Sequence, residues 1–252
     1  MKIPFYKYEG TGNDFILIDN QNHQIDKLSV DLIKKLCHRK WGIGADGLIL
    51  IQKDKEVDFE MIYFNSDGSQ SLCGNGSRCA IHFAKHLGII KDKTTFRAFD
   101  GIHEGYIKEN DIYFKMKNVE SIQKIKDHFE VNTGSPHYIT FVDNSNQIDV
   151  VSVGRKIRNL YEKGINVNFV EKKEDSIFVR TYERGVEDET LSCGTGVTAC
   201  ALIMGELGMK SPIHVQTLGG ELKVEFSKIN NMFQEIYLIG PARMVFTGEF
   251  IV

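Results

Sequence analysis

The sequence predicts an α+β protein built from two lobes that face each other, each with strands around a central helix. Three observations predict this class. Short strand-like runs fill both halves, with few helices between them. A Cys-Gly-X-Gly phrase occurs twice, at Cys73 and at Cys193, about half a chain apart. Each phrase leads into an apolar helical pattern. The repeated order indicates an internal duplication.

In the first half, β-branched and aromatic runs bounded by Gly, Asn and Asp have the pattern of strands. Ser29 is placed to cap a helix that extends through Lys40. After Cys73, apolar residues recur at i, i+3, i+4 and i+7, and the pattern ends at Gly88, a residue suited to a helix end. The expected strands are 5–8, 15–19, 48–51, 59–64, 94–99 and 112–116.

The second half repeats this style. From Val197 through Leu207 the residues are apolar on nearly every face, and the run ends at Gly208. A helix that is hydrophobic all round is buried, so this helix is expected to form the core of its half. The expected strands are 138–142, 167–170, 176–182, 214–217, 222–226, 235–239 and 244–250.

These patterns place an N-terminal lobe at residues 1–118, carrying Cys73, and a C-terminal lobe at 119–242, carrying Cys193. The polar stretch 118–128 has no apolar periodicity and is the expected join. A cleft between the lobes is the default place for an active site.

Composition excludes several classes of protein. The net charge of −3 argues against a protein that binds nucleic-acid phosphates. No run approaches the ~18 apolar residues of a membrane span, and the first residues lack the apolar core of a signal peptide. Five cysteines are an odd number in a large chain, which argues against a secreted disulfide framework and favours the cytoplasm.

Cofactor motifs are weak. Gly42–Gly47 matches G-x-G-x-x-G, but no alternation of strands and helices surrounds it, so a dinucleotide site is not expected. The cysteine spacings C-x5-C and C-x6-C fit no common zinc site. Cys79 and Cys200 fall inside the helical patterns and are expected in the core. No metal and no cofactor are therefore expected.

The matched cysteines carry the chemistry. A thiol at a helix N-terminus is shifted toward thiolate by the helix dipole and nearby backbone N–H groups. Two such thiols, one in each half, suggest an acid and a base of the same kind on opposite sides of one small-molecule substrate. Three further phrases are candidates on local grounds: Gly10–Phe15 between two strands, Gly134–His137 and Tyr182–Gly185.

Taken together, these phrases resemble the diaminopimelate epimerases, a family of cofactor-independent amino-acid racemases. Any one phrase is weak evidence, but eight in the family's order are specific and cover essentially the whole chain. The matching phrases are Gly12–Phe15, Gly42–Gly47, Phe64–Gly68, Cys73–Cys79, Gly134–His137, Asn166–Phe169, Tyr182–Gly185 and Cys193–Gly196.

The resemblance implies two pseudo-symmetric lobes, each a mainly antiparallel sheet around a central helix, with the final strand, about 243–252, returning to the first lobe. It implies epimerisation of L,L-diaminopimelate to meso-diaminopimelate, a step in lysine and peptidoglycan precursor biosynthesis. Cys73 and Cys193 match the two catalytic cysteines: one thiolate removes the α-proton and one thiol protonates the opposite face. His137 and Glu183 match residues that adjust the pKa values of the cysteines.

The substrate-binding positions also match. Two pairs at the helix starts match the family's sites for the α-carboxylate, and four other residues match those for the amino and distal carboxylate groups. The implied substrate-binding residues are Asn13, Asn65, Gly74, Asn75, Asn166, Glu183, Arg184, Gly194 and Thr195.

Two positions depart from the family pattern. Ser135 stands where many members have Asn, and Gly47 stands where some members have a Gln that contacts substrate. Both bear on specificity and not on the proton transfers. Rival interpretations are a racemase of another amino acid, of the proline or hydroxyproline type, and a non-catalytic ligand-binding relative. A phenazine-type isomerase is disfavoured because it lacks the double cysteine. A homodimer is possible.

Overall fold

The computed structural model describes residues 2–22, 25 and 28–251. The chain divides into two compact units. Unit 1 is Met1–Phe114 with Gly240–Val252, and unit 2 is Lys115–Ile239. The sequence placed the boundaries after residues 118 and 242, a few residues later than the observed boundaries after Phe114 and Ile239. Val252, the last residue of the expected final strand, lies outside the described residues.

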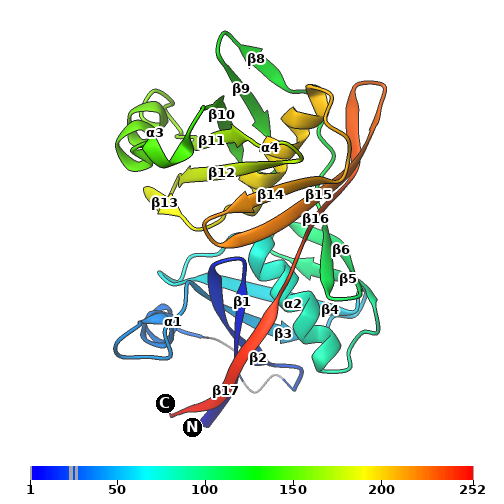
Figure 1. The fold of residues 1–252 in the computed structure, drawn as a ribbon. Helices are drawn as coiled ribbons and strands as arrows, with labels where there is room; N and C mark the ends of the chain where they lie inside the picture. Colours follow the sequence, from blue (N-terminus) through cyan, green and yellow to red (C-terminus); the bar gives the residue numbers. More distant parts are fainter. Residues whose placement is uncertain (1, 23–24, 26–27, 252) are drawn as a thin grey trace. The chain divides into compact units, whose positions relative to one another are not determined.

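The sheet of unit 1 begins with a strand from the far end of the chain. Strand β17 pairs antiparallel with β1, and Figure 1 shows the two side by side, red beside blue. The remaining pairs are antiparallel except for β2–β3 and β4–β5, which are parallel. The strands in sheet order are β17 (Arg243–Ile251), β1 (Lys2–Gly10), β2 (Asn13–Asp19), β3 (Gly47–Gln52), β4 (Phe59–Asn65), β5 (Lys93–Ala98), β6 (Gly101–Lys108) and β7 (Asp111–Lys115).

The sheet of unit 2 repeats this pattern pair for pair. Its parallel pairs, β10–β11 and β12–β14, stand at the places of β2–β3 and β4–β5. The short strand β13 (Asp188–Thr190) pairs beside β12. The strands in sheet order are β8 (Gln123–Ile125), β9 (His128–Asn132), β10 (Pro136–Phe141), β11 (Asn166–Lys172), β12 (Ser176–Glu183), β14 (Ile213–Thr217), β15 (Gly220–Ile229) and β16 (Met232–Gly240). The predicted duplication and mainly antiparallel sheets are confirmed.

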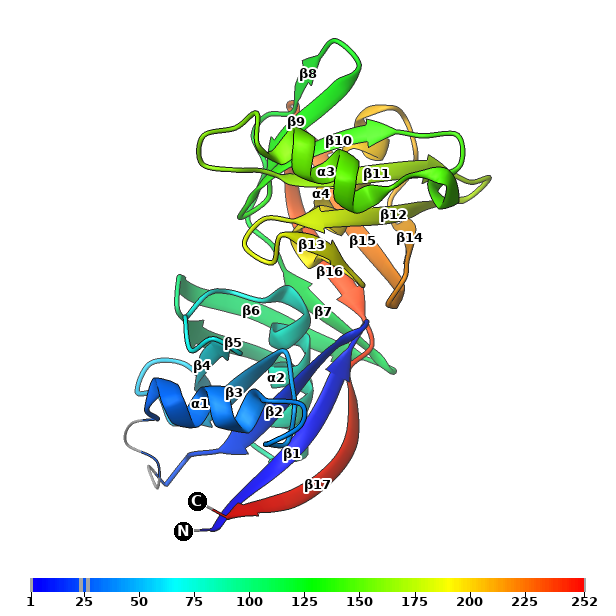
Figure 2. The ribbon, with the colours of Figure 1, turned by 90° about the vertical axis from the view of Figure 1, so that its left-hand side faces the viewer.

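The helices are inserted at matching places in the two units. Helix α2 packs against β1, β2, β3, β4 and β6, and α4 packs against β9 to β12, β14 and β15, so each is the central helix of its unit. A second helix, α1 in unit 1 and α3 in unit 2, follows the first strand of the first parallel pair and covers the other face of the sheet. Figure 2 shows α3 in front of β11 and β12, with α4 behind them. The helices are α1 (Val30–Cys37), α2 (Gly74–His86), α3 (Val150–Arg158) and α4 (Gly194–Glu206), with a 3₁₀ turn at Ser145–Gln147.

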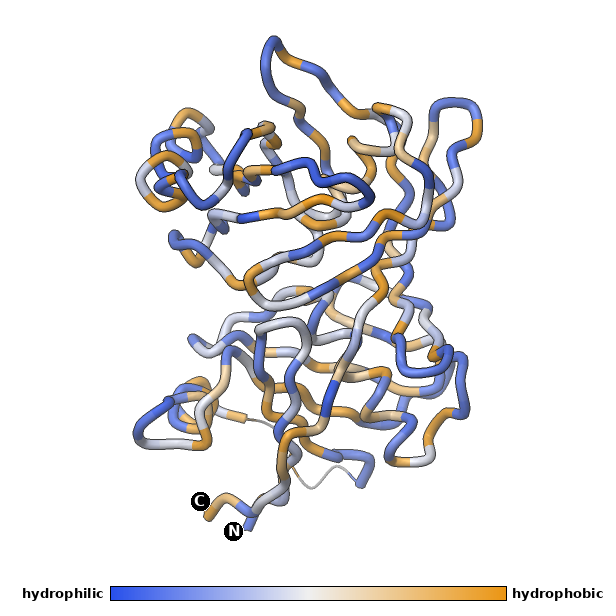
Figure 3. The backbone as a smooth tube through the Cα atoms, viewed as in Figure 1, coloured by the Kyte–Doolittle hydropathy of each residue, from blue (hydrophilic) through white to orange (hydrophobic). Residues whose placement is uncertain are grey.

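The cores follow from the hydrophobic pattern. Every residue of α4 from Gly196 to Met204 is buried, as its apolar sequence predicts. Strand β14 alternates buried and exposed residues. Figure 3 shows hydrophobic and hydrophilic residues alternating along parts of the chain. The helix ends predicted at Gly88 and Gly208 are confirmed: both glycines have positive φ, 72° and 99°. Cys79 and Cys200 are buried as predicted.

Two helix predictions are corrected. The first helix ends at Cys37 and does not reach Lys40, because His38 is extended and its ring nitrogen accepts hydrogen bonds from the next turn. Helix α3 was not expected, since Gly154 lowers the helix propensity of this short segment. In the fold, a Cβ at Gly154 would lie 2.4 Å from the Cβ of Tyr182, so the glycine is what lets α3 pack on β12.

Candidate active site

Cys73 is the N-cap residue of α2. Its backbone is extended (φ −122°, ψ 116°), its carbonyl accepts from Ser77 N, and its sulfur accepts from Gly76 N at 3.4 Å. The first backbone N–H groups of a helix, here those of Gly74 and Asn75, have no intrahelical acceptor. Cys73 therefore stands, half-buried, at the positive end of the central helix of unit 1.

Cys193 holds the same place in unit 2. It is the N-cap of α4 with nearly the same backbone (φ −121°, ψ 108°), and its carbonyl accepts from Val197 N. Its sulfur lies 3.5 Å from Thr195 Oγ1, and the residue is 7% exposed. The prediction that each cysteine begins a central helix is confirmed.

The two helix starts differ in charge. Five residues after Cys73 stands Arg78, which is fully buried and donates to Thr11 Oγ1 at 2.8 Å. Its Nε and Nη1 have no hydrogen-bond partner among the described residues. The equivalent residue after Cys193 is Thr198, whose hydroxyl donates to Gly194 O. A buried guanidinium therefore lies beyond the start of the central helix in unit 1, and a neutral hydroxyl group takes its place in unit 2.

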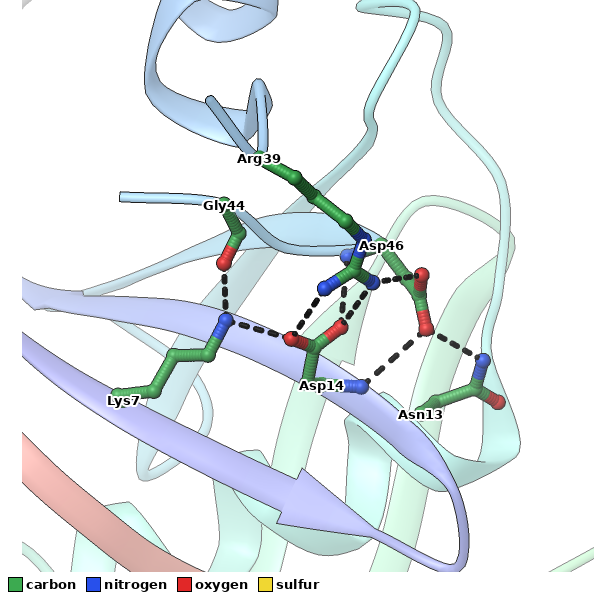
Figure 4. Close-up of polar contacts among 6 residues, drawn as sticks. All are labelled: Lys7, Asn13, Asp14, Arg39, Gly44 and Asp46. Atoms are coloured by element: carbon green, nitrogen blue, oxygen red, sulfur yellow. Dashed lines mark hydrogen bonds and ion pairs between the residues drawn. The ribbon is translucent and has the colours of Figure 1, made fainter. Parts of the chain in front are cut away.

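Asn13 is held by two neighbours at the start of β2. Its amide nitrogen donates to Asp46 Oδ2 at 2.9 Å, and its carbonyl accepts from Asn75 Nδ2 at 2.7 Å. Figure 4 shows the Asp46 carboxylate between Asn13 and the guanidinium of Arg39. Because a carboxylate only accepts, the contact with Asp46 fixes which end of the Asn13 amide is the nitrogen. Asn13 thus joins Asn75, in the first turn of α2, to an ion-pair network.

The network is centred on Asp14. Arg39 donates to both of its oxygens, at 2.7 and 3.0 Å, and Lys7 donates to it at 2.6 Å and also to Gly44 O (Figure 4). Burial alone would raise the pKa of Asp14, but the hydrogen bonds and charges of Arg39 and Lys7 lower it to about 2. Asp14 therefore carries its charge throughout the neutral range.

We expect Asp14→Asn to lower the free energy of unfolding by about 1–2 kcal/mol at pH 6, with the loss shrinking as the pH falls toward 2. The folded pKa is depressed, so the stabilisation is complete above the unfolded pKa of about 3.9 and is lost as the pH falls through about 2. Arg39 is 60% exposed, which screens the pair and keeps the effect below the full value.

Urea denaturation between pH 2 and 6 measures this difference. Asp92→Asn is the matched control, because it removes one carboxylate from an exposed pair with Lys85. A loss of stability in Asp14→Asn that is the same at every pH would contradict the expectation.

Asn65 lies at the end of β4, fixed by hydroxyl groups. Its amide nitrogen donates to Ser69 Oγ and Ser71 Oγ, and its carbonyl accepts from Tyr63 at 2.9 Å. The Tyr63 ring also explains Gly47 on the neighbouring strand. A Cβ at Gly47 would lie 2.4 Å from Tyr63 Cε2 and 2.7 Å from the backbone oxygen of Phe64, so a glutamine does not fit there unless both the ring and the strand move.

In unit 2, Asn166 and Arg184 come together around Ser135. Asn166 donates to Ser135 Oγ at 2.8 Å and accepts from the backbone N–H of Arg184 at 2.9 Å. The guanidinium donates to Lys163 O and lies 3.4 Å from Ser135 Oγ. Among the described residues, Arg184 forms no ion pair. Glu183, half-buried, ends β12 immediately before it.

His137 lies in strand β10 and is completely buried. Its Nε2 is 2.9 Å from Thr195 Oγ1, and its Nδ1 is 3.1 Å from Asn168 Nδ2. Burial and the nearby charge of Arg184 lower its pKa to about 3. His137 is therefore neutral at physiological pH and is joined through Thr195 to Cys193.

Sequence reasoning missed several residues of these clusters. Asp46, which is itself paired with Arg39, holds Asn13. Asn168 holds His137. Asp46 and Asn168 fall inside phrases that matched the family, but their side-chain partners come from other segments of the chain, so only the fold reveals them. Within the described part of the chain, no group of three or more His, Cys, Asp or Glu is placed to hold a metal ion, and no helix has the length and apolar content needed to cross a membrane.

Comparison with known proteins shows the family of this chain. A sequence model of the diaminopimelate epimerases matches residues 5–121 and 129–245. Diaminopimelate epimerase of Flavobacterium psychrophilum is 53% identical over 249 residues, covering 96% of this chain and 97% of the relative. That of Aquifex aeolicus is 40% identical, covering 97% and 96%.

Solved structures share the fold at low identity. A phenazine biosynthesis protein of the PhzF family from Bacillus anthracis aligns over 100% of both chains, with a TM-score of 0.77 and 15% identity. A hydroxyproline epimerase from Agrobacterium vitis covers 98% of this chain and 92% of its own, with a TM-score of 0.70 and 12% identity.

Proposed function

The chain belongs to the diaminopimelate epimerase family, and on this premise we propose that it is an isomerase that converts L,L-diaminopimelate to meso-diaminopimelate for lysine and peptidoglycan precursors. The observation that carries the proposal is the pair of cysteines, each the N-cap of the central helix of its unit. The five free thiols support a place in the reducing cytoplasm.

We assign the proton transfers to Cys73 and Cys193. Inversion at carbon requires a base that takes the α-proton from one face and an acid that protonates the other, because a single base tends to return the proton to the face it left. One cysteine enters the reaction as thiolate and the other as thiol, and their roles exchange in the reverse direction. The chain supplies both groups itself, so the proton transfers need no cofactor.

The helix starts supply the electrostatic stabilisation. The α-proton of an amino acid is only weakly acidic, so negative charge that develops in the transition state must be stabilised. The backbone N–H groups of Gly74, Asn75, Gly194 and Thr195 lie in the first turns of α2 and α4. Such N–H groups and the helix dipoles favour a carboxylate and its developing charge.

The other polar residues select the substrate. We propose that Arg184 binds the distal carboxylate, with Asn166 and Ser135 fixing its position through the contacts described above. Asn13, Asn65 and Glu183 are assigned to the remaining polar groups of the substrate. Proline and hydroxyproline have no distal carboxylate or second amino group, so these side chains favour a diamino diacid over the substrates of the rival racemases.

Deuterium incorporation tests the function. L,L-diaminopimelate incubated with the protein in heavy water should gain one deuterium at the inverted α-carbon as meso-diaminopimelate forms. Proline and 4-hydroxyproline, incubated in parallel, should keep their α-protons. Exchange into proline but not into diaminopimelate would assign the chain to another racemase. Tight binding of diaminopimelate without exchange would indicate a non-catalytic relative.

A further inference from the structure

A buried polar set lies under the start of α4 where the duplicate unit is mainly hydrophobic. Strand register equates the pair Asn168 and Thr181 with Ile49 and Tyr63, and it equates His137 with Phe15. All six side chains are buried, with exposed fractions of 5% or less. The polar set of unit 2 is His137, Asn168 and Thr181.

Both sets pack on the third residue of their central helix. A Cβ at Gly76 would lie 3.4 Å from Ile49 Cδ1, and one at Gly196 would lie 2.4 Å from Asn168 Oδ1. Buried polar groups are tolerated only where their hydrogen-bond partners are supplied, so a polar set needs matched donors and acceptors that an apolar set does not need. Unit 1 shows that Phe15 and Ile49 fill the equivalent space without that requirement. The polar set therefore requires an explanation beyond packing.

The hydrogen bonds fix the direction of every donor. Asn168 Nδ2 lies 3.1 Å from the carbonyl of Tyr138, which can only accept, so this atom is the amide nitrogen. Thr181 Oγ1 donates to the amide oxygen at 3.0 Å, which agrees with this orientation. The same nitrogen then donates to His137 Nδ1, which must be unprotonated. A neutral histidine has one N–H, so here it is on Nε2.

The direction continues to the sulfur. His137 Nε2 donates to Thr195 Oγ1 at 2.9 Å, so the Thr195 hydroxyl proton is free to point elsewhere. Cys193 Sγ lies 3.5 Å from this oxygen. The loop before β10 holds Thr195 in place, since Thr133 Oγ1 donates to its carbonyl at 2.8 Å. When Cys193 is ionised, its sulfur is an acceptor for this hydroxyl proton.

We infer that Asn168 is a positioning residue for the reaction: it holds His137 as the Nε2–H tautomer and thereby commits the Thr195 hydroxyl to donate to the Cys193 sulfur. The role in catalysis rests on the proposed function. The neutral state of His137 fits this arrangement, because a neutral ring keeps a single proton on Nε2 across the working pH range. Thr181 supports the arrangement by orienting the amide of Asn168.

Nitrogen-15 NMR of the unsubstituted protein tests the tautomer directly. With labelled histidine, His137 should show an unprotonated Nδ1 and a protonated Nε2 from pH 5 to 9, with no titration. A protonated Nδ1, or equal populations of the two tautomers, would overturn the inference. This readout needs no substrate, and it decides the question even if a substituted chain fails to fold.

Asn168→Leu tests the link to the sulfur. Leucine has about the same volume as asparagine but cannot donate a hydrogen bond to His137 Nδ1. The proton of the neutral ring is then no longer confined to Nε2. Hydrogen bonds to ionised groups are worth more than neutral ones, so alkylation of Cys193 at neutral pH should slow about tenfold. The pH midpoint of that alkylation should move up by about one unit. Mass spectrometry of the same sample also measures the alkylation rate of Cys73, which should not change.

Further variants separate positioning from folding. Thr195→Val should match Asn168→Leu at Cys193, and Thr195→Ser should restore the natural rate. Ile49→Leu, a change at the equivalent position of unit 1, is the control and should leave Cys193 alkylation unaltered. Unchanged alkylation of Cys193 in folded Asn168→Leu would refute the inference. If the tautomer and the alkylation rates are as expected but no deuterium enters diaminopimelate, the proposed function is refuted and the positioning of the Cys193 sulfur is not.

Discussion

Replacing either Cys73 or Cys193 with alanine should abolish epimerisation, with kcat reduced by at least about 10³-fold. Acid–base groups contribute roughly 10²–10⁴-fold each, and here the loss of one also leaves one face of the substrate without a proton donor or acceptor. Serine at either position should retain slightly more activity than alanine, because a hydroxyl is a much weaker acid and base than a thiol. Chiral chromatography of the products measures both effects.

Cys37→Ala is the matched control for these variants. Cys37 is also a buried, free thiol, but it lies in the outer helix α1, packed with Ile33 and Leu36 on the core of unit 1. Its loss should reduce stability slightly and leave turnover near that of the natural chain. Near-natural turnover in either Cys73→Ala or Cys193→Ala would show that the two-cysteine assignment is wrong.

Arg184→Ala should have the next largest effect. Removing one partner from a desolvated, hydrogen-bonded charge pair costs about 2–5 kcal/mol. At about 1.4 kcal/mol per decade, kcat/KM for diaminopimelate should fall by roughly 30-fold to several-thousand-fold. The side chain of Asn166 still accepts from the backbone N–H at position 184, so the variant should fold. Steady-state kinetics with L,L-diaminopimelate measures the loss.

Arg184→Lys separates charge from geometry. A guanidinium offers a rigid fork of donors that matches a carboxylate, whereas an ammonium is a point charge, so lysine should restore only part of the lost kcat/KM. Lysine as a substrate lacks the distal carboxylate, and its turnover, if measurable, should be insensitive to Arg184. Diaminopimelate turnover that is untouched in Arg184→Ala would contradict the substrate assignment.

The sequence predicted the central helices better than the outer ones. Helices α2 and α4 combine a capping cysteine, a long apolar pattern and a terminal glycine, and each of these signals is local. Helix α3 has a glycine in its middle, and its stability comes from packing on Tyr182, a contact made across sequence-distant elements. Helix α1 ends early because the His38 ring accepts a hydrogen bond from the backbone of the following turn. The spacing of apolar residues gives no sign of such a contact.

Site residues were predictable where a short phrase contained the whole signal. Both cysteine helix starts are of this kind, and the structure places them as expected. The arrangement of Asn168 and Thr181 depends on strand register, which pairs residues from β11 and β12 opposite each other. The partners of Asn13 come likewise from separate segments of the chain. Such contacts are properties of the sheet and not of any one segment.

The path of the chain orders the assembly of the two units. In unit 2 the outer strand β8 precedes its neighbour β9 by a short turn, whereas the corresponding strand of unit 1, β17, is the last to be synthesised. Every residue of unit 2 therefore emerges from the ribosome before β1 can meet its outer partner. Joining strands from opposite ends of a chain carries a large loop-closure entropy, which slows the pairing. During translation, the unit that holds Cys193 can fold first, and the sheet around Cys73 closes last.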